Sequence, residues 1–196
     1  MIIDDGMILM INDFNDDMIL MINDFNNNMI INDNNITQLI YFIMAGTYSQ
    51  IYIQYVFTVK GRENLLQKPW RDEVFKYISG IIKGKNQKPI IVNGVADHVH
   101  VFVGLKPAMN ISDLVRDIKN NSSKFINEQQ FLNCKFSWQE GYGVFSYAHS
   151  QIASVYQYIA NQEEHHHKKT FREEYIDFLQ KFEIEYNEKF LFEWID

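Results

Sequence analysis

Two histidines separated by a single residue are the feature of this sequence with the clearest potential for chemistry. His98, Val99 and His100 begin the run HVHVFVGL, whose apolar residues recur at the spacing of a strand. Residues i and i+2 of a strand point to one face, so the two imidazoles converge while Val99 turns into the core. Such a pair suits a divalent metal ion, and the alternative is a surface strand that merely carries two histidines. Asp97 is a candidate partner for these histidines, but we do not rely on it, because a neighbour in a strand points to the opposite face.

A tyrosine and a glutamine follow some sixty residues later, in a segment with helical spacing. Tyr158 and Gln162 are i and i+4, which places them on one face of a helix. A tyrosine hydroxyl beside a metal ion is a plausible nucleophile, because a cation lowers the cost of forming phenolate. A glutamine oxygen can be a third hard ligand. The chain contains 11 tyrosines, so Tyr156 and Tyr158 are alternatively ordinary aromatic residues of a helix.

Basic residues gather on the predicted helix 112–128. Arg116, Lys119 and Lys124 stand there among asparagines and serines. This pattern suits contacts to DNA phosphates, and a solvated helix face explains it equally well. The three histidines at 165–167 are not expected to share one metal ion, because consecutive helical residues fan out by about 100°. With the two lysines that follow, they are better suited to contact phosphate.

The elements that must position these residues follow from the hydrophobic pattern. We expect a strand over 51–59, a helix over 69–84, strands over 89–95 and 98–105, a helix over 112–128 and a strand over 135–147. Helices over 151–167 and 171–182 come last. The first six elements have the ferredoxin-like order. We therefore predict an α+β fold: a four-stranded antiparallel sheet with helices on one face plus a C-terminal catalytic helix. The second face would be free for a ligand or partner.

The first 43 residues differ from the rest in composition and charge. An 11-residue unit occupies 7–17 and 18–28 as MILMINDFNDD and MILMINDFNNN, and residues 1–43 contain seven Asp and no Lys or Arg. We interpret 1–43 as a low-complexity extension without a fold of its own, from a non-native start or disordered, and 44–196 as the functional domain. The middle of the chain, 44–170, carries a net charge of +5, although the whole chain carries −7. A basic middle is compatible with nucleic-acid binding.

Several classes of protein are disfavoured. A single cysteine excludes a disulfide framework and a multi-cysteine zinc site. No glycine-rich phosphate-binding loop is present, so we expect no nucleotide cofactor. No segment is long and apolar enough to predict a membrane span, and we expect a cytoplasmic protein with no membrane partner.

Taken together, four segments resemble the small HUH tyrosine transposases of single-strand insertion sequences, the IS200-like and REP-associated enzymes. These segments are MAGTYSQIYIQYVFTVK, GVADHVHVFVGL, FSWQEGYGVFSYAHSQ and YIANQEEHHHKKTFREEY, and the resemblance runs from about residue 44 onward. A His-hydrophobic-His strand followed by Tyr-x-x-x-Gln on a helix is the specific part of the pattern.

The resemblance implies a mechanism and partners. Tyr158 would be the nucleophile, and His98, His100 and Gln162 would hold Mg²⁺ or Mn²⁺. The enzyme would cleave and rejoin single-stranded DNA at hairpin-bearing element ends through a 5′-phosphotyrosine, as a homodimer, and Arg116, Lys119 and Lys124 would hold the DNA backbone. The alternative is a domesticated or non-catalytic ferredoxin-like protein that binds single-stranded or hairpin DNA.

Overall fold

A computed structural model describes residues 2–3, 7–11, 20–24, 27–31, 48–166, 170–187 and 191. The chain divides into two compact units, Met1–Tyr48 and Ser49–Asp196. No helix in the described part of the chain is long and apolar enough to cross a membrane.

The first unit contains short backbone strands where the sequence analysis expects no regular fold. They are β1 (Ile2–Ile3), β2 (Met7–Ile11), β3 (Leu20–Asp24) and β4 (Asn27–Ile31), paired antiparallel in that order. The apolar, isoleucine-containing runs of the repeat have the composition of strands, and the intervening Asn and Asp residues are typical of turns. The domain boundary after residue 43 stays a prediction.

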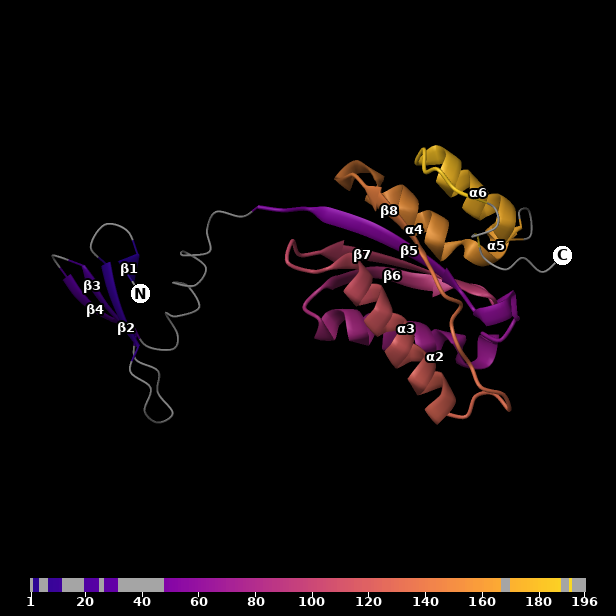
Figure 1. Cartoon of the computed structure of the whole chain (residues 1–196), viewed down its shortest axis with the longest axis horizontal. Coiled ribbons are helices and arrows are strands. Elements are labelled where there is room, and N and C mark those ends of the chain that lie inside the picture. Colours follow the sequence, from indigo (N-terminus) through magenta and orange to yellow (C-terminus); the bar gives the residue numbers. More distant parts are fainter. Residues whose placement is uncertain are drawn as a thin grey trace. The chain divides into compact units, whose positions relative to one another are not determined.

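The second unit is built on one antiparallel sheet, which is the predicted ferredoxin-like sheet (Figure 1). Its strands are β5 (Ile51–Thr58), β6 (Lys88–Gly94), β7 (His98–Leu105) and β8 (Gly143–Tyr147), in the spatial order β6-β7-β5-β8. The two central strands, β5 and β7, pair along their whole length, from Ile51 opposite Leu105 to Thr58 opposite His98. The strand that carries the two histidines is therefore hydrogen-bonded on both sides, to β6 and to β5.

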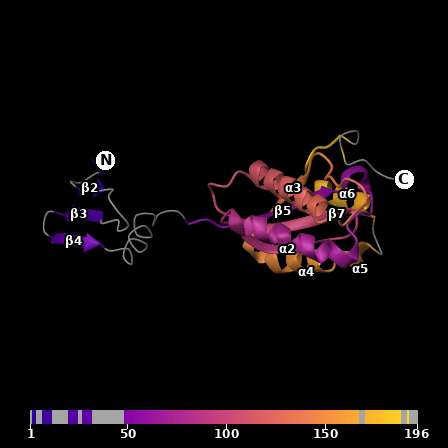
Figure 2. The same ribbon diagram turned by 90° about the horizontal axis from the view of Figure 1, so that it is seen from below.

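One face of the sheet is covered by two long helices, α2 (Lys68–Gly84) and α3 (Ile111–Glu128), which lie side by side (Figure 2). Pro69 suits the first turn of α2, where its missing N–H is not needed. The Asn110 side chain caps α3 by accepting from the backbone N–H groups of Ser112 and Asp113. Between the helices and the sheet lies the main apolar core. Its fully buried members include Phe57, Ile78, Val101, Leu114 and Ile118.

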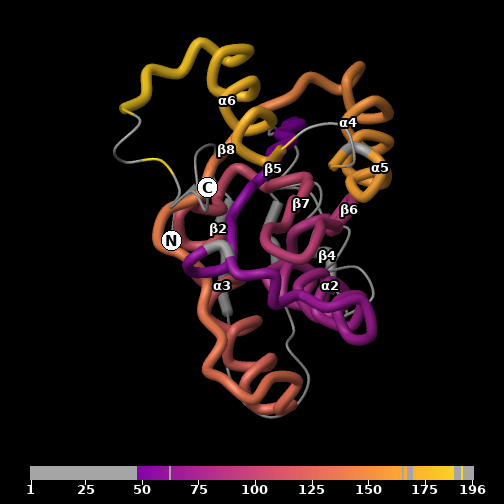
Figure 3. The backbone as a smooth tube through the Cα atoms, turned by 90° about the vertical axis from the view of Figure 1, so that its right-hand side faces the viewer, coloured from indigo at the N-terminus to yellow at the C-terminus, as the bar shows by residue number. Residues whose placement is uncertain are grey.

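The sequence analysis expects the other face to be free, but the C-terminal helices cover it (Figure 3). They are α4 (Ile152–Ala160), α5 (Gln162–His166) and α6 (Phe171–Lys181). A capping box starts α6, because Thr170 accepts from the N–H of Glu173 and the Glu173 carboxylate accepts from the N–H of Thr170. Two small apolar clusters attach this layer, one around Phe145 and Tyr175 and one around Phe102 and Ile159.

Of the predicted strand over 135–147, the last five residues form β8, and Trp138 adds an isolated antiparallel bridge to Val59. The backbone before β8 bonds partly to the backbone at the end of β5, through Ser137 and Gln139, and partly to side chains of α3. Asn127 binds both backbone groups of Phe136, and the Lys119 ammonium donates to the carbonyls of Gln139 and Gly141. Gly141 has a φ of 78°, which favours glycine and interrupts the extended chain. Short 3₁₀ turns complete the unit at Lys60–Arg62 and His149–Gln151.

Candidate metal and nucleophile site

The alternation of β7 places its two histidines on the face of the sheet that carries the C-terminal helices. Val99, Val101 and Val103 point into the core under α2 and α3. His98 and His100 point the other way, are fully buried, and have ring centroids 5.1 Å apart. The predicted convergence of the pair is confirmed in geometry, and the alternative of a surface strand is wrong, because α6 covers the rings.

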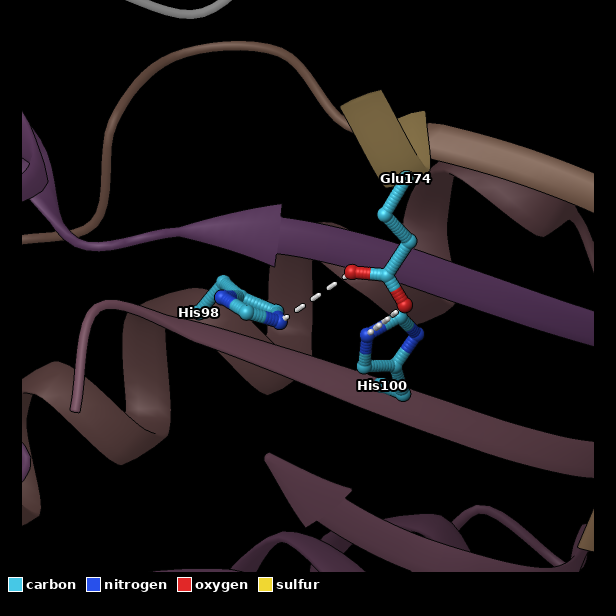
Figure 4. Close-up of side chains that lie close together, drawn as sticks. All are labelled: His98, His100 and Glu174. Atoms are coloured by element: carbon cyan, nitrogen blue, oxygen red, sulfur yellow. Dashed lines mark ion pairs between the residues drawn. The ribbon is translucent and has the colours of Figure 1, made fainter. Parts of the chain in front are cut away.

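A carboxylate that the sequence analysis did not select lies between the two histidines. Glu174, on α6, reaches between the imidazoles, with Oε2 at 3.7 Å from His98 Nε2 and Oε1 at 3.6 Å from His100 Nε2 (Figure 4). One ligand atom from each of the three residues lies within 4.8 Å of the other two. Burial, followed by the charges of Asp97 and Asp177, raises the pKa of Glu174 to about 8.

Gln162 belongs to the same cluster. Its Oε1 lies 3.4 Å from His98 Nε2, its Nε2 donates to Glu174 Oε1 at 3.1 Å, and its side chain is fully buried. His166 adds a third imidazole at the rim, with Nε2 at 3.1 Å from both Gln162 Oε1 and Glu174 Oε2. One member of the His165–His167 run thus reaches the site, which the sequence analysis did not expect.

The predicted single helix over 151–167 is wrong, because the chain turns at Asn161 between α4 and α5. Asn93 of β6 stabilises this turn by donating to the carbonyls of Ile159 and Ala160. On the far side of the turn, Glu163 forms ion pairs with Lys68 and Arg71 of α2. Tyr158 and Gln162 are therefore not i and i+4 on one regular helix.

Tyr158 nevertheless lies beside the cluster. Its ring centroid is 6.0 Å from that of His100 and 5.7 Å from that of Phe178, both in edge-to-face contact. A pocket of about 330 Å³ opens next to it. The residues lining this pocket are Tyr147, Ser154, Val155, Tyr158, Glu174, Asp177, Phe178 and Lys181.

The outer nitrogen of His98 has a partner that orients the ring. Asp97 Oδ1 lies 2.8 Å from His98 Nδ1, so a proton on Nδ1 directs the Nε2 lone pair toward Glu174 and Gln162. This carboxylate–histidine arrangement is typical of metal-binding histidines. Setting Asp97 aside was wrong because Asp97 precedes β7 in a bend, where strand alternation does not apply.

His100 is oriented by a buried amide. Gln54 of β5 donates from Nε2 to His100 Nδ1 at 2.8 Å, and the Tyr147 hydroxyl donates to Gln54 Oε1 at 2.7 Å. Turning this amide by 180° presents Oε1 to a protonated Nδ1 and leaves Nε2 of His100 as a ligand. Tyr147 remains a partner in both orientations, because a hydroxyl both donates and accepts.

The donor set fits a divalent cation. Bonds of about 2.1 Å around an octahedral ion place adjacent ligands about 3 Å apart and opposite ligands about 4 Å apart. Gln162 lies 3.4 Å from His98 and Glu174 lies 3.7 and 3.6 Å from the two histidines, which is close to these values. His98, His100 and Glu174 all offer ligand atoms within 4.8 Å of one another. Imidazole nitrogens together with carboxylate and amide oxygens suit Mn²⁺. Mg²⁺ prefers a ligand set with fewer nitrogens and more oxygens.

The three predicted DNA-contacting residues lie in the other layer, on α3. Arg116 forms ion pairs with Asp113 at 2.7 Å and Asp117 at 3.9 Å, and Lys124 lies 3.7 Å from Glu128. The Lys119 ammonium is held by two carbonyls, at 2.6 and 2.8 Å, and burial lowers its pKa. The structure thus does not bring these residues to the histidine pair, and their contact with DNA stays a prediction.

Sequence reasoning missed Glu174 and Gln54, and it set Asp97 aside. Glu174 lies 12 positions beyond Gln162, and no spacing rule connects the two helices on which they lie. Gln54 gave a usable signal, since it is a polar residue in the strand IYIQYVFT on the face opposite to the apolar one.

The chain is similar to several known proteins. Residues 47–162 match the family model described as transposase, IS200 like. A Deinococcus radiodurans R1 protein described as a candidate transposase has a similar crystal structure, with 21% identity, a TM-score of 0.50, and coverage of 60% of this chain and 94% of that one. A REP-associated tyrosine transposase bound to a REP hairpin gives 14% identity, a TM-score of 0.48, and coverage of 61% and 71%. No curated protein matches the chain.

Proposed function

This chain belongs to the IS200-like transposase family, and we propose that it cleaves and rejoins single-stranded DNA through Tyr158, with a divalent cation held by His98, His100 and Gln162. The observation that carries the proposal is the buried imidazole pair on β7, of which the His100 ring lies in edge-to-face contact with Tyr158. A tyrosine beside two convergent imidazoles that can hold a cation is suited to phosphoryl transfer to tyrosine.

The proposed chemistry is a two-step transfer through a phosphotyrosine. The Tyr158 oxygen loses its proton and attacks the scissile phosphorus, which forms a phosphotyrosine bond and breaks the bond to the 3′ oxygen. That oxygen takes up a proton and leaves as a free 3′-OH. A second 3′-OH can attack the phosphotyrosine and rejoin the strands, because the phosphodiester energy is retained. When bound, the ion supplies Lewis-acid polarisation of the phosphate oxygens.

The chain's own residues prepare this step. Asp97 and Gln54 orient the two imidazoles, and the turn at Asn161 carries Gln162 to their side. The pocket beside Tyr158 contains Lys181 and Ser154, which offer an ammonium and a hydroxyl to a phosphate. Positioning of this kind supplies much of the rate in phosphoryl transfer.

We further propose that the substrate is a hairpin-bearing element end and that the enzyme acts as a homodimer, as the family resemblance implies. A groove of about 390 Å³ beside α3, lined in part by Arg116, Asn120, Trp138 and Tyr142, offers charge and aromatic surface for DNA. Because this groove lies in the layer opposite to His98, it would hold DNA away from the cleavage point.

A cleavage assay tests the proposal. Labelled single-stranded DNA carrying the hairpins that flank the gene is incubated with the protein, with and without Mn²⁺, and separated on a denaturing gel. We expect a metal-dependent covalent adduct that is lost in Tyr158→Phe and retained in Tyr156→Phe, a matched control two residues away on the exposed side of α4. DNA binding without an adduct would support the alternative, a non-catalytic hairpin-binding protein.

A further inference from the structure

We propose that Glu174 is a ligand of the divalent cation, so that helix α6 completes a four-residue site with His98, His100 and Gln162. The proposal rests on the proposed function and deepens it, because it assigns the ion an anionic ligand. Glu174 lies beyond residues 47–162, the segment that matches the family model.

The position of the carboxylate is the first argument. Its two oxygens face different imidazoles, at 3.7 Å from His98 Nε2 and 3.6 Å from His100 Nε2, so the group bridges the pair (Figure 4). Gln162 Oε1 approaches His98 Nε2 from another side, at 3.4 Å. The four groups come from β7, α5 and α6, so a strand in the middle of the sheet and two C-terminal helices contribute to the cluster.

Burial of charge is the second argument. Glu174 is only 3% exposed, and a buried carboxylate is stabilised when a cation is held against it. A carboxylate is more often stabilised by basic side chains, as Glu163 is by its ion pairs with Lys68 and Arg71. Glu174 instead faces imidazoles and the amide of Gln162. Imidazoles and amides are themselves metal ligands, so this environment suits an ion shared among them.

The coordination number is the third argument. Two imidazoles, one amide oxygen and one carboxylate oxygen occupy four of about six positions around Mg²⁺ or Mn²⁺. Two positions are then left for phosphate oxygens, on the side where the pocket holds both Tyr158 and Glu174. The number and charge of the ligands also set affinity, so a carboxylate strengthens a site that is otherwise neutral.

The competing role for Glu174 is structural. Gln162 Nε2 donates to it at 3.1 Å, and His166 Nε2 lies at the same distance, so the carboxylate could serve only as a hydrogen-bond acceptor that fastens α6. Glu174→Gln separates the two roles, because glutamine preserves the size and an acceptor oxygen but removes the charge. The matched control is Glu73→Gln, the same change at an exposed acid on α2, in the layer on the other face of the sheet.

Mn²⁺ affinity, measured by calorimetry without DNA, is the first readout. We expect Glu174→Gln to weaken Mn²⁺ binding at least about tenfold. Glu73→Gln should change it by less than about threefold, because exposed charges are screened. Circular dichroism checks that both variants fold. Equal affinity in Glu174→Gln and the wild type, or equal weakening in both variants, would overturn the proposal.

The second readout is amide hydrogen exchange, measured on the wild-type protein with and without Mn²⁺. If Glu174 binds the ion, Mn²⁺ must slow amide exchange in α6 (171–181) together with β7. Slowing in β7 and α5 without α6 contradicts the proposal. Both readouts are independent of cleavage: a metal-dependent adduct with unchanged Mn²⁺ affinity in Glu174→Gln rejects this ligand alone, whereas absence of any wild-type adduct rejects the proposed function.

Discussion

The two faces of one strand do different work in this molecule. On the face under α2 and α3, β7 presents Val99, Val101 and Val103 to an apolar core. On the face under α4 and α6, the same strand presents His98 and His100 to a carboxylate and an amide. Both faces are fully buried, so burial alone does not distinguish a packing surface from a reactive one.

The difference lies in how the buried groups are stabilised. The valine face stabilises the folded state by removing apolar surface from water, which contributes about 25 cal/mol per Å². The histidine face buries polar groups, which is unfavourable unless each has a partner. Asp97, Gln54 and Tyr147 supply such partners. We infer that packing on the first face stabilises the fold. That stability compensates for burying the polar groups of the candidate site on the second face.

The largest expected effect comes from removing an imidazole. His100→Ala should lose ion binding and cleavage by more than about 100-fold, because only three of four ligands remain and the ring next to Tyr158 is gone. Thermal unfolding with and without Mn²⁺ provides the measurement. At an ion concentration 100 times Kd, the wild type gains about 2.7 kcal/mol. This gain should vanish in His100→Ala, and a full gain in the variant would contradict the assignment.

The matched change on the opposite face is Leu114→Ala. Leu114 is 1% exposed in the core under α3, so its truncation should lower the free energy of unfolding by about 2–5 kcal/mol. The Mn²⁺-dependent gain should be unchanged while the protein remains folded. Urea unfolding with and without the ion checks both statements. Loss of the gain in this variant would show that the two faces are not separable.

A smaller effect is expected from Asp97→Asn. This residue fixes the ring of His98 through Nδ1, and loss of such a partner typically weakens metal binding by about 10–100-fold. Mn²⁺ titration measures it, and the protein should remain folded because Asp97 lies outside β7. An unchanged affinity would indicate that the backbone alone orients His98.

The smallest effect is expected from Tyr147→Phe. The hydroxyl acts on the ion only through Gln54 and His100, so its loss should weaken Mn²⁺ binding by less than about tenfold. The readout is Mn²⁺ affinity beside the pH dependence of binding, which a purely packing role would not shift. A loss as large as that of His100→Ala would mean that Tyr147 contacts the ion or substrate directly.

The sequence predicts the sheet and the histidine pair well because both depend on local periodicity. Apolar alternation in 51–58 and 98–105 gives the two central strands and decides which side chains of β7 share a face. The same alternation failed at Asp97, which lies just outside the strand. Residues 135–142 also do not form a continuous strand, because Asn127 and Lys119 of α3 bind part of their backbone.

The rest of the site depends on contacts between distant segments. Gln162 is buried because Asn93, on β6, holds the turn at Asn161. Glu174 joins the cluster because α6 packs through Phe171 and Tyr175 onto Val56 and Phe145 of the sheet. No short motif encodes either arrangement, so the sequence pointed to two imidazoles and a tyrosine but not to the carboxylate between them.

The most direct test of the account is to locate the covalent bond itself. The Mn²⁺-dependent adduct with single-stranded hairpin DNA would be digested with protease and nuclease, and the nucleotide-bearing peptide sequenced by mass spectrometry. We predict that the nucleotide phosphate is attached to Tyr158, next to His100 and the pocket that contains Glu174. Attachment to Tyr156, Tyr147 or any other residue would contradict the account.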